Sequence, residues 1–104
     1  DCTGHAEMVL VRTAQKRLGL GALRGSTVYA SGEPCAMCCG AMFWGGVRRV
    51  VYAASTTQIA EALGGPLLPL RSAEVLAAAS PAMTVDGPLM GDEAFAVLQR
   101  FVPD

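Results

Sequence analysis

The sequence contains no long apolar run, although apolar residues make up 52% of it. Arg, Gly, Pro and Ser interrupt every candidate before it reaches the roughly 18–20 residues that a membrane span needs. No signal peptide or targeting motif is recognisable either. A mean hydropathy of +0.39 with only 16% charged residues excludes the composition of a disordered chain. The 104 residues suit one folded domain and are too few for two.

An excess of basic residues is also absent. Eight Lys and Arg residues stand against nine Asp and Glu residues, which gives a formal charge of −1 and a pI near 5.7. A chain that binds nucleic acid through its own surface is usually basic. A small-molecule partner is therefore favoured over a nucleic acid such as tRNA.

The four cysteines are not spread along the chain. Cys2 is isolated, whereas Cys35, Cys38 and Cys39 fall within five residues. A secreted disulfide framework distributes its cysteines so that they close several loops. We therefore expect a cytoplasmic protein in which the clustered cysteines serve another purpose.

Helical and extended patterns alternate along the chain. Apolar spacing and turn residues predict helices over 5–19, 34–44, 57–63, 72–79 and 91–102, and strands over 27–31, 48–55 and 83–87. Thr3 is the expected N-cap of the first helix, which places His5 and Glu7 in its first turn. This order predicts a single α/β domain over 1–104 with parallel strand pairs. Three strands make a thin sheet with an exposed edge.

Two short stretches carry the residues that are suited to chemistry. Cys35 and Cys38 lie three positions apart at the start of a predicted helix, so both thiolates fall on one face. One His and two Cys can bind Zn²⁺ and leave a fourth tetrahedral position for water. Zinc lowers the pKa of such a water toward ~7. Glu7, two residues beyond His5, is then placed to carry protons in a hydrolytic deamination.

Two other interpretations of Cys35 and Cys38 remain open. Cys35 and Cys38 form a C-x-x-C pair that would also suit a redox function. A structural zinc site would need a fourth protein ligand, for which Cys2 is a candidate. Cys39 points about 100° away from Cys38 around a helix, so it is expected to be a small buried residue.

The stretches HAE at 5–7 and EPCAMC at 33–38 resemble the zinc-dependent cytidine deaminase superfamily, whose pattern is H-x-E followed by P-C-x-x-C. The resemblance covers most of 1–56 and is strongest to the branch that holds guanine deaminases and tRNA adenosine deaminases. It implies a three-layer α/β/α fold with a mixed central sheet, and commonly a homodimer. Family members usually have an N-terminal helix and hairpin that this chain lacks. Either the chain is a fragment, or another polypeptide supplies these elements.

Carried over residue by residue, the resemblance implies that His5, Cys35 and Cys38 bind one Zn²⁺ and that Glu7 is the general acid/base. It further implies substrate contacts at Ala6, Glu33 and Pro34. The implied reaction is the hydrolytic deamination of a nucleobase, nucleoside or related small aminated heterocycle. In that reaction zinc-bound hydroxide attacks the amine-bearing ring carbon, and ammonia is released.

The aromatic pair Phe43 and Trp44 is a candidate platform for a planar base. The guanine deaminase-like branch resembles this chain in having an aromatic-Trp pair here. The C-terminal stretch over 91–104 has one Arg against three acidic residues, which suits tRNA poorly. A free base or nucleoside is therefore the expected substrate. A tRNA adenosine deaminase and a non-catalytic assembly partner remain the alternatives.

Overall fold

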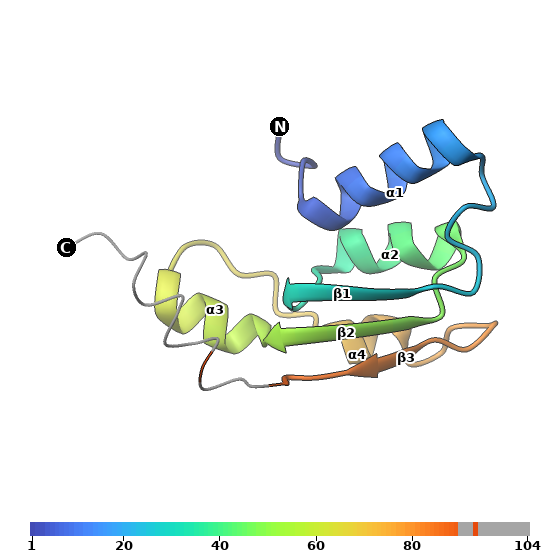
Figure 1. Ribbon diagram of the computed structural model, residues 1–104. Coiled ribbons are helices and arrows are strands. Elements are labelled where there is room, and N and C mark those ends of the chain that lie inside the picture. Colours follow the sequence, from blue (N-terminus) through green and yellow to red (C-terminus); the bar gives the residue numbers. More distant parts are fainter. Residues whose placement is uncertain (90–92, 94–104) are drawn as a thin grey trace.

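Seven helices and strands follow one another in the computed structural model, which describes residues 1–89 and 93 (Figure 1). They are α1 (Ala6–Leu18), β1 (Thr27–Gly32), α2 (Ala36–Gly45), β2 (Arg49–Ala54), α3 (Thr56–Leu63), α4 (Ser72–Leu76) and β3 (Thr84–Asp86). Each corresponds to a predicted element. The helix predicted over 91–102 lies outside the described residues apart from Glu93. Among the described helices, none has the length and apolar character needed to cross a membrane.

The three strands form one parallel sheet in the order β1-β2-β3. Val28 of β1 is paired with Val50 of β2, which is paired in turn with Val85 of β3. The expectation of a mixed sheet is therefore wrong for the described strands. β1 and β2 are each followed by a helical crossover that returns the chain to the same end of the sheet, and such connections produce parallel neighbours.

Helices cover one face of this sheet. Met42 of α2 and Leu76 of α4 belong to the same buried cluster as Val28 and Val50, and α1 packs on α2 (Figure 1). Tyr29 is paired with Val51 and its side chain lies on the opposite face, where it is 74% exposed. The second helical layer implied by the resemblance does not cover Tyr29 in the described part of the chain.

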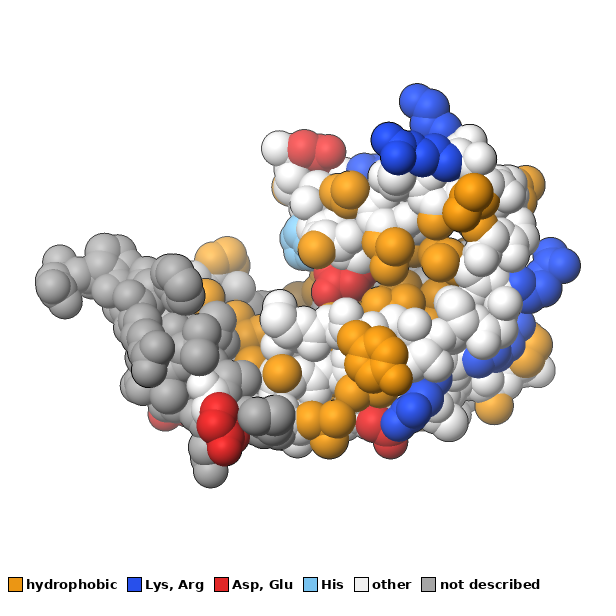
Figure 2. Space-filling model, viewed as in Figure 1, with side chains coloured by type: hydrophobic (Ala, Val, Ile, Leu, Met, Phe, Trp, Pro, Cys, Tyr) orange, Lys and Arg blue, Asp and Glu red, His pale blue; other side chains and the backbone are white. Residues whose placement is uncertain are grey.

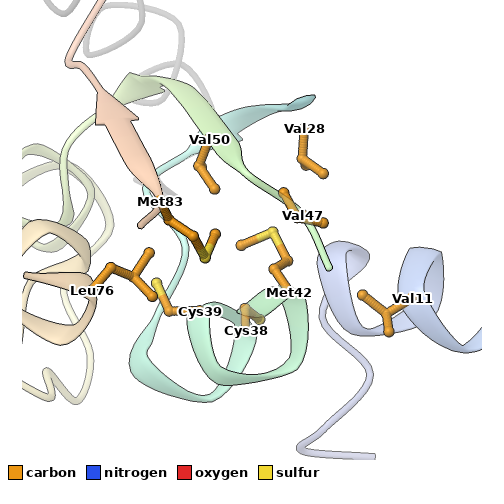
Figure 3. Packing of buried hydrophobic residues seen from close by; sticks show 9 residues of the cluster. All are labelled: Val11, Val28, Cys38, Cys39, Met42, Val47, Val50, Leu76 and Met83. Carbon is orange, nitrogen blue, oxygen red and sulfur yellow. The ribbon is translucent and has the colours of Figure 1, made fainter. Parts of the chain in front are cut away.

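The core lies between the sheet and α2. Figure 3 shows side chains from the strands, from α2 and from α4 pointing toward one another. Cys39 is fully buried within this cluster, and its Sγ donates to the carbonyl of Pro34 at 3.6 Å. The prediction that Cys39 is a small buried residue is confirmed.

The start of α1 differs from the prediction. His5, not Thr3, occupies the N-cap position, with extended backbone angles and no side-chain capping bond. Thr3 instead donates from its amide and its hydroxyl to Oδ1 of Asp1, at 2.9 and 2.8 Å. Because the His5 ring makes no hydrogen bond to a helix amide, its nitrogen atoms are available to bind a metal ion.

The end of α2 depends on a glycine. Gly46 has φ 91° and ψ 10°, and a Cβ built on it would lie 3.0 Å from Cα of Arg24. We expect Gly46→Ala to lower the free energy of unfolding by about 1–3 kcal/mol, because left-handed backbone and contact with another backbone both disfavour a side chain. Urea denaturation measures this change.

Gly40 supplies the matched control, since it lies inside α2 and a Cβ built on it meets no atom within 4 Å. Gly40→Ala should leave stability unchanged or raise it by up to about 1 kcal/mol, because alanine favours helix. Equal destabilisation by both substitutions would contradict the role given to Gly46.

Candidate metal centre and active site

The three predicted metal ligands converge on one point. Nδ1 of His5 lies 3.5 Å from Sγ of Cys35 and 3.5 Å from Sγ of Cys38, and the two sulfurs are 3.6 Å apart. These residues come from separate parts of the chain, and together they form a group able to hold a metal ion. The structure therefore brings His5 together with two cysteines that follow it by 30 and 33 positions in the sequence.

The spacing of these donors fits zinc. Tetrahedral Zn²⁺ with bonds of about 2.3 Å to sulfur and about 2.0 Å to nitrogen places the sulfurs roughly 3.8 Å apart and each sulfur roughly 3.5 Å from the nitrogen. The distances above agree with these values to within about 0.2 Å. Cys2 is exposed and does not belong to this group among the described residues. Three protein ligands leave a position for water, which favours a catalytic over a structural zinc site.

Two helix N-termini place the ligands. His5 immediately precedes α1, and Cys35 is the N-cap of α2 with Cys38 in the first turn. The two helices pack together, and their N-termini lie on the same side of the pair (Figure 1). A helix N-terminus carries a partial positive charge, which stabilises thiolates and so favours metal binding.

Burial makes the thiols of Cys38 and Cys39 weak acids, and of these two only Cys38 belongs to the metal group. Burial raises the pKa of the Cys38 thiol well above its ordinary value, and the neighbouring Cys35 and Glu7 raise it further. Burial likewise raises the pKa of Cys39 to about 12, so that thiol stays neutral. Zinc would supply the opposing positive charge at Cys38, and its binding would release a proton.

Glu7 lies in the first turn of α1 and lines a cavity of about 220 Å³ between α1 and β1. Ala6 lines the same cavity, as do Tyr29 and Ala30 from β1. The chain has one histidine, which Figure 2 shows in pale blue at the surface. The substrate contact predicted for Ala6 stays a prediction.

Glu33 and Pro34 are buried directly before the first metal cysteine. The Glu33 carboxylate accepts hydrogen bonds from the Thr56 amide at 2.8 Å, from Nε of Arg71 at 3.1 Å, and from the amide and hydroxyl of Ser72. Burial alone would raise the pKa of Glu33, but the hydrogen bonds from Ser72, Thr56 and Arg71 outweigh it and lower the pKa to about 2. The substrate contacts predicted for Glu33 and Pro34 stay untested.

Arg71 and Ser72 are the residues that sequence reasoning missed at this place. They lie nearly forty positions after Glu33, and no local pattern connects them to it. A polar pair at the start of a predicted helix is an ordinary helix-start signal. Only the fold shows that Arg71 also donates to the hydroxyl of Tyr52, at 3.2 Å.

Phe43 and Trp44 lie at the end of α2 that is remote from the ligands. Trp44 comes nine positions after Cys35, which corresponds to about 13 Å along a helix. The two rings form an edge-to-face pair with centroids 5.0 Å apart, and Trp44 is 84% exposed. Phe43 instead lines a groove of about 250 Å³ with Val75 and Leu76 of α4. Contact of Phe43 and Trp44 with a base stays a prediction, and their distance from the metal group does not favour it.

Several proteins of known type are similar to this chain. The Bacillus subtilis guanine deaminase is 47% identical over 62 residues, which cover 60% of this chain and 40% of the relative. A protein of Schizosaccharomyces pombe described as a probable cytosine deaminase is 39% identical over 98 residues, or 90% of this chain and 59% of the relative. The Agrobacterium fabrum tRNA-specific adenosine deaminase is 41% identical over 54 residues, or 52% and 36%.

Solved structures show the same relationship. The guanine deaminase from Nitrosomonas europaea superposes with a TM-score of 0.65 and 30% identity, over 94% of this chain and 56% of that one. A structure of NE0047 in complex with 2,6-diaminopurine gives a TM-score of 0.66 and 31% identity, over 95% and 54%. The chain thus spans about half the length of the proteins that it matches.

A sequence model of one protein family, described as the cytidine and deoxycytidylate deaminase zinc-binding region, matches residues 1–54. This range is just over half of the 104 residues, and it contains His5, Glu7, Cys35 and Cys38. The geometry of these residues and the match agree on the same site. The chain therefore belongs to the cytidine and deoxycytidylate deaminase zinc-binding family.

Proposed function

We propose that this chain carries the catalytic zinc site of a hydrolytic deaminase that acts on a free aminated nucleobase, with guanine as the first candidate. The observation that supports this most directly is the donor triangle of His5, Cys35 and Cys38 with Glu7 beside it. Family membership gives the triangle its expected chemistry.

His5, Cys35 and Cys38 would hold a Zn²⁺ ion, which would make a water acidic enough to act as a nucleophile near neutral pH. Glu7 accepts one proton from this water as the water oxygen forms a bond to the amine-bearing ring carbon, and it delivers that proton to the adjacent ring nitrogen. The second proton of the water passes through Glu7 to the amino group. The exocyclic C–N bond then breaks, ammonia leaves, and a carbonyl remains on the ring.

A free base is favoured over tRNA by the extent of the matches. In sequence, similarity to the Bacillus subtilis guanine deaminase covers 60% of the chain and similarity to the Agrobacterium fabrum tRNA-specific adenosine deaminase covers 52%. A guanine deaminase structure also superposes on 94% of the chain. The ligand 2,6-diaminopurine in one matching structure is itself an aminated purine. On the face shown in Figure 2, Lys and Arg side chains lie away from the histidine. Cytosine is the second candidate, because a probable cytosine deaminase matches 90% of the chain.

We propose that the chain forms a homodimer and that a further strand pairs with the outer edge of β1. Trp44 is 84% exposed beside the α2–α4 groove, and large exposed aromatic side chains are typical of interfaces. The outer edge of β1 has no partner among the described strands. A strand from a second polypeptide segment suits that edge, because it would pair the free backbone groups. A non-catalytic assembly partner stays an alternative function for the same reason.

The proposed location is the cytoplasm. Cys35 and Cys38 are free thiols 3.6 Å apart, and they bind a metal only while they are reduced. A reducing compartment maintains this state.

Ammonia release from zinc-loaded protein tests the proposed function. The panel is guanine, 2,6-diaminopurine, cytosine, adenosine and a tRNA anticodon stem-loop. We expect turnover of guanine to exceed turnover of the stem-loop by at least about 100-fold in kcat/KM, which corresponds to about 2.7 kcal/mol. Exclusive turnover of the stem-loop would contradict the choice of a free base. Release no faster than from Glu7→Gln for every substrate would contradict catalysis by this chain.

A further inference from the structure

Glu33 is a buried carboxylate that the proposed reaction does not use. Its side chain is 0% exposed, and both oxygens have donors. Oε1 accepts from the Thr56 amide and from Arg71, while Oε2 accepts from the amide of Ser72 at 3.0 Å and from its hydroxyl. A buried charge is strongly unfavourable unless it is paired and hydrogen-bonded in this way. The network therefore depends on all of its members being in place.

These hydrogen bonds join four elements at one point. Glu33 directly follows β1, Thr56 is the first residue of α3, and Ser72 is the first residue of α4. The amide of Glu33 also donates to the carbonyl of Ala54, the last residue of β2, at 2.7 Å. Glu33 thus fixes the ends of two strands relative to the starts of two helices.

The metal centre begins one residue beyond this network. Only Pro34 separates Glu33 from Cys35, and its ring restricts φ to about −65°. Pro34 is itself buried, and its carbonyl accepts from Sγ of Cys39 at 3.6 Å. A displacement of Glu33 is therefore passed on to Cys35, whose Sγ must stay within 3.5–3.6 Å of the other two donors.

We propose that Glu33 is a positioning residue for the metal centre, which it serves by holding Cys35 in place through the network with Thr56, Arg71 and Ser72. In this role its buried side chain contacts neither the metal nor the substrate, so the substrate contact predicted for Glu33 could involve only its backbone. The proposal rests on the metal centre and is independent of which base is deaminated.

Glu33→Gln tests the proposal through metal binding. The variant keeps the size of the side chain, but its amide NH₂ group faces donors that need an acceptor. We expect the dissociation constant for Zn²⁺, measured by chelator competition, to rise about 10–100-fold, the range found for residues that orient metal ligands. The visible absorption bands of the Co²⁺-substituted protein should shift or lose intensity, because the ligand geometry changes. Ser72→Ala, which removes one donor and keeps the carboxylate, should cause a smaller change in the same direction.

Asp86→Asn is the matched control. It makes the same carboxylate-to-amide change in an exposed ion pair. The Asp86 side chain is 47% exposed and that of its partner Arg49 is 48% exposed. We expect no change in zinc affinity or in the cobalt spectrum. If Glu33→Gln does not fold, Ser72→Ala decides the question.

Wild-type zinc affinity and a wild-type cobalt spectrum in the folded variants would overturn the proposal, even where the free energy of unfolding falls. Zinc binding by the wild-type protein without ammonia release would contradict the proposed function alone. A wild-type protein that binds no zinc would overturn the metal centre, and the positioning role with it.

Discussion

Replacing Glu7 with Gln should lower the rate of ammonia release by about 10²–10⁴-fold, the usual contribution of a general acid–base residue. The amide has the size of the carboxylate but cannot accept a proton from water and pass it to the ring nitrogen. Glu7 is not one of the three donors of the metal group. The zinc content, measured by atomic absorption, should therefore stay at one ion per chain.

The loss should appear in kcat more than in KM, because Glu7 acts on protons that move during the reaction. Glu61→Gln is the control, since Glu61 lies exposed on α3 and takes no part in the proposed site. Loss of zinc from Glu7→Gln would show that Glu7 is a ligand or supports one. Loss of activity in both variants would show an effect of net charge instead.

The candidate metal donors were predicted partly from local patterns and partly from the family resemblance. His5 precedes a helix start and Cys35 and Cys38 lie at another, so their local geometry follows from helix periodicity and position. The close approach of His5 to Cys35 is a tertiary contact that no spacing encodes. Its prediction required the resemblance to the deaminase superfamily, and the structure places the three atoms within 3.6 Å.

Other features depended on tertiary contacts without any local signal. Arg71 and Ser72 reach Glu33 only because the fold places the start of α4 beside the end of β1. An Arg-Ser pair in the sequence gives no sign of this contact. The sheet is parallel because the described strands are all linked by helical crossovers, and an antiparallel strand would require elements outside the described residues. Trp44 looked suited to a base, but helix length places it roughly 13 Å from Cys35 along α2.

Cys38→Ala should abolish stoichiometric zinc binding and lower the thermal stability of the protein. Removal of one of three ligands leaves two donors, and the binding free energy that zinc contributes to the folded state is lost with them. A loss of about 3 kcal/mol would lower the midpoint of unfolding by roughly 12–24 °C in a domain of this size. Differential scanning calorimetry with and without a chelator measures the midpoint of unfolding and the part of it that depends on zinc. The chelator should lower the midpoint of the wild-type protein and leave that of Cys38→Ala unchanged.

The neighbouring cysteine provides the control for this result. Cys39 is as completely buried as Cys38, but its sulfur contacts the Pro34 carbonyl and not the other donors. Cys39→Ala should reduce stability by about 1–2 kcal/mol through lost packing while the protein keeps its zinc and its sensitivity to the chelator. Zinc loss in both variants would mean that the core around α2, rather than the thiolate of Cys38, determines metal binding. Zinc retention in Cys38→Ala would remove Cys38 from the ligand set, and the fourth position would then no longer be the only one open to water.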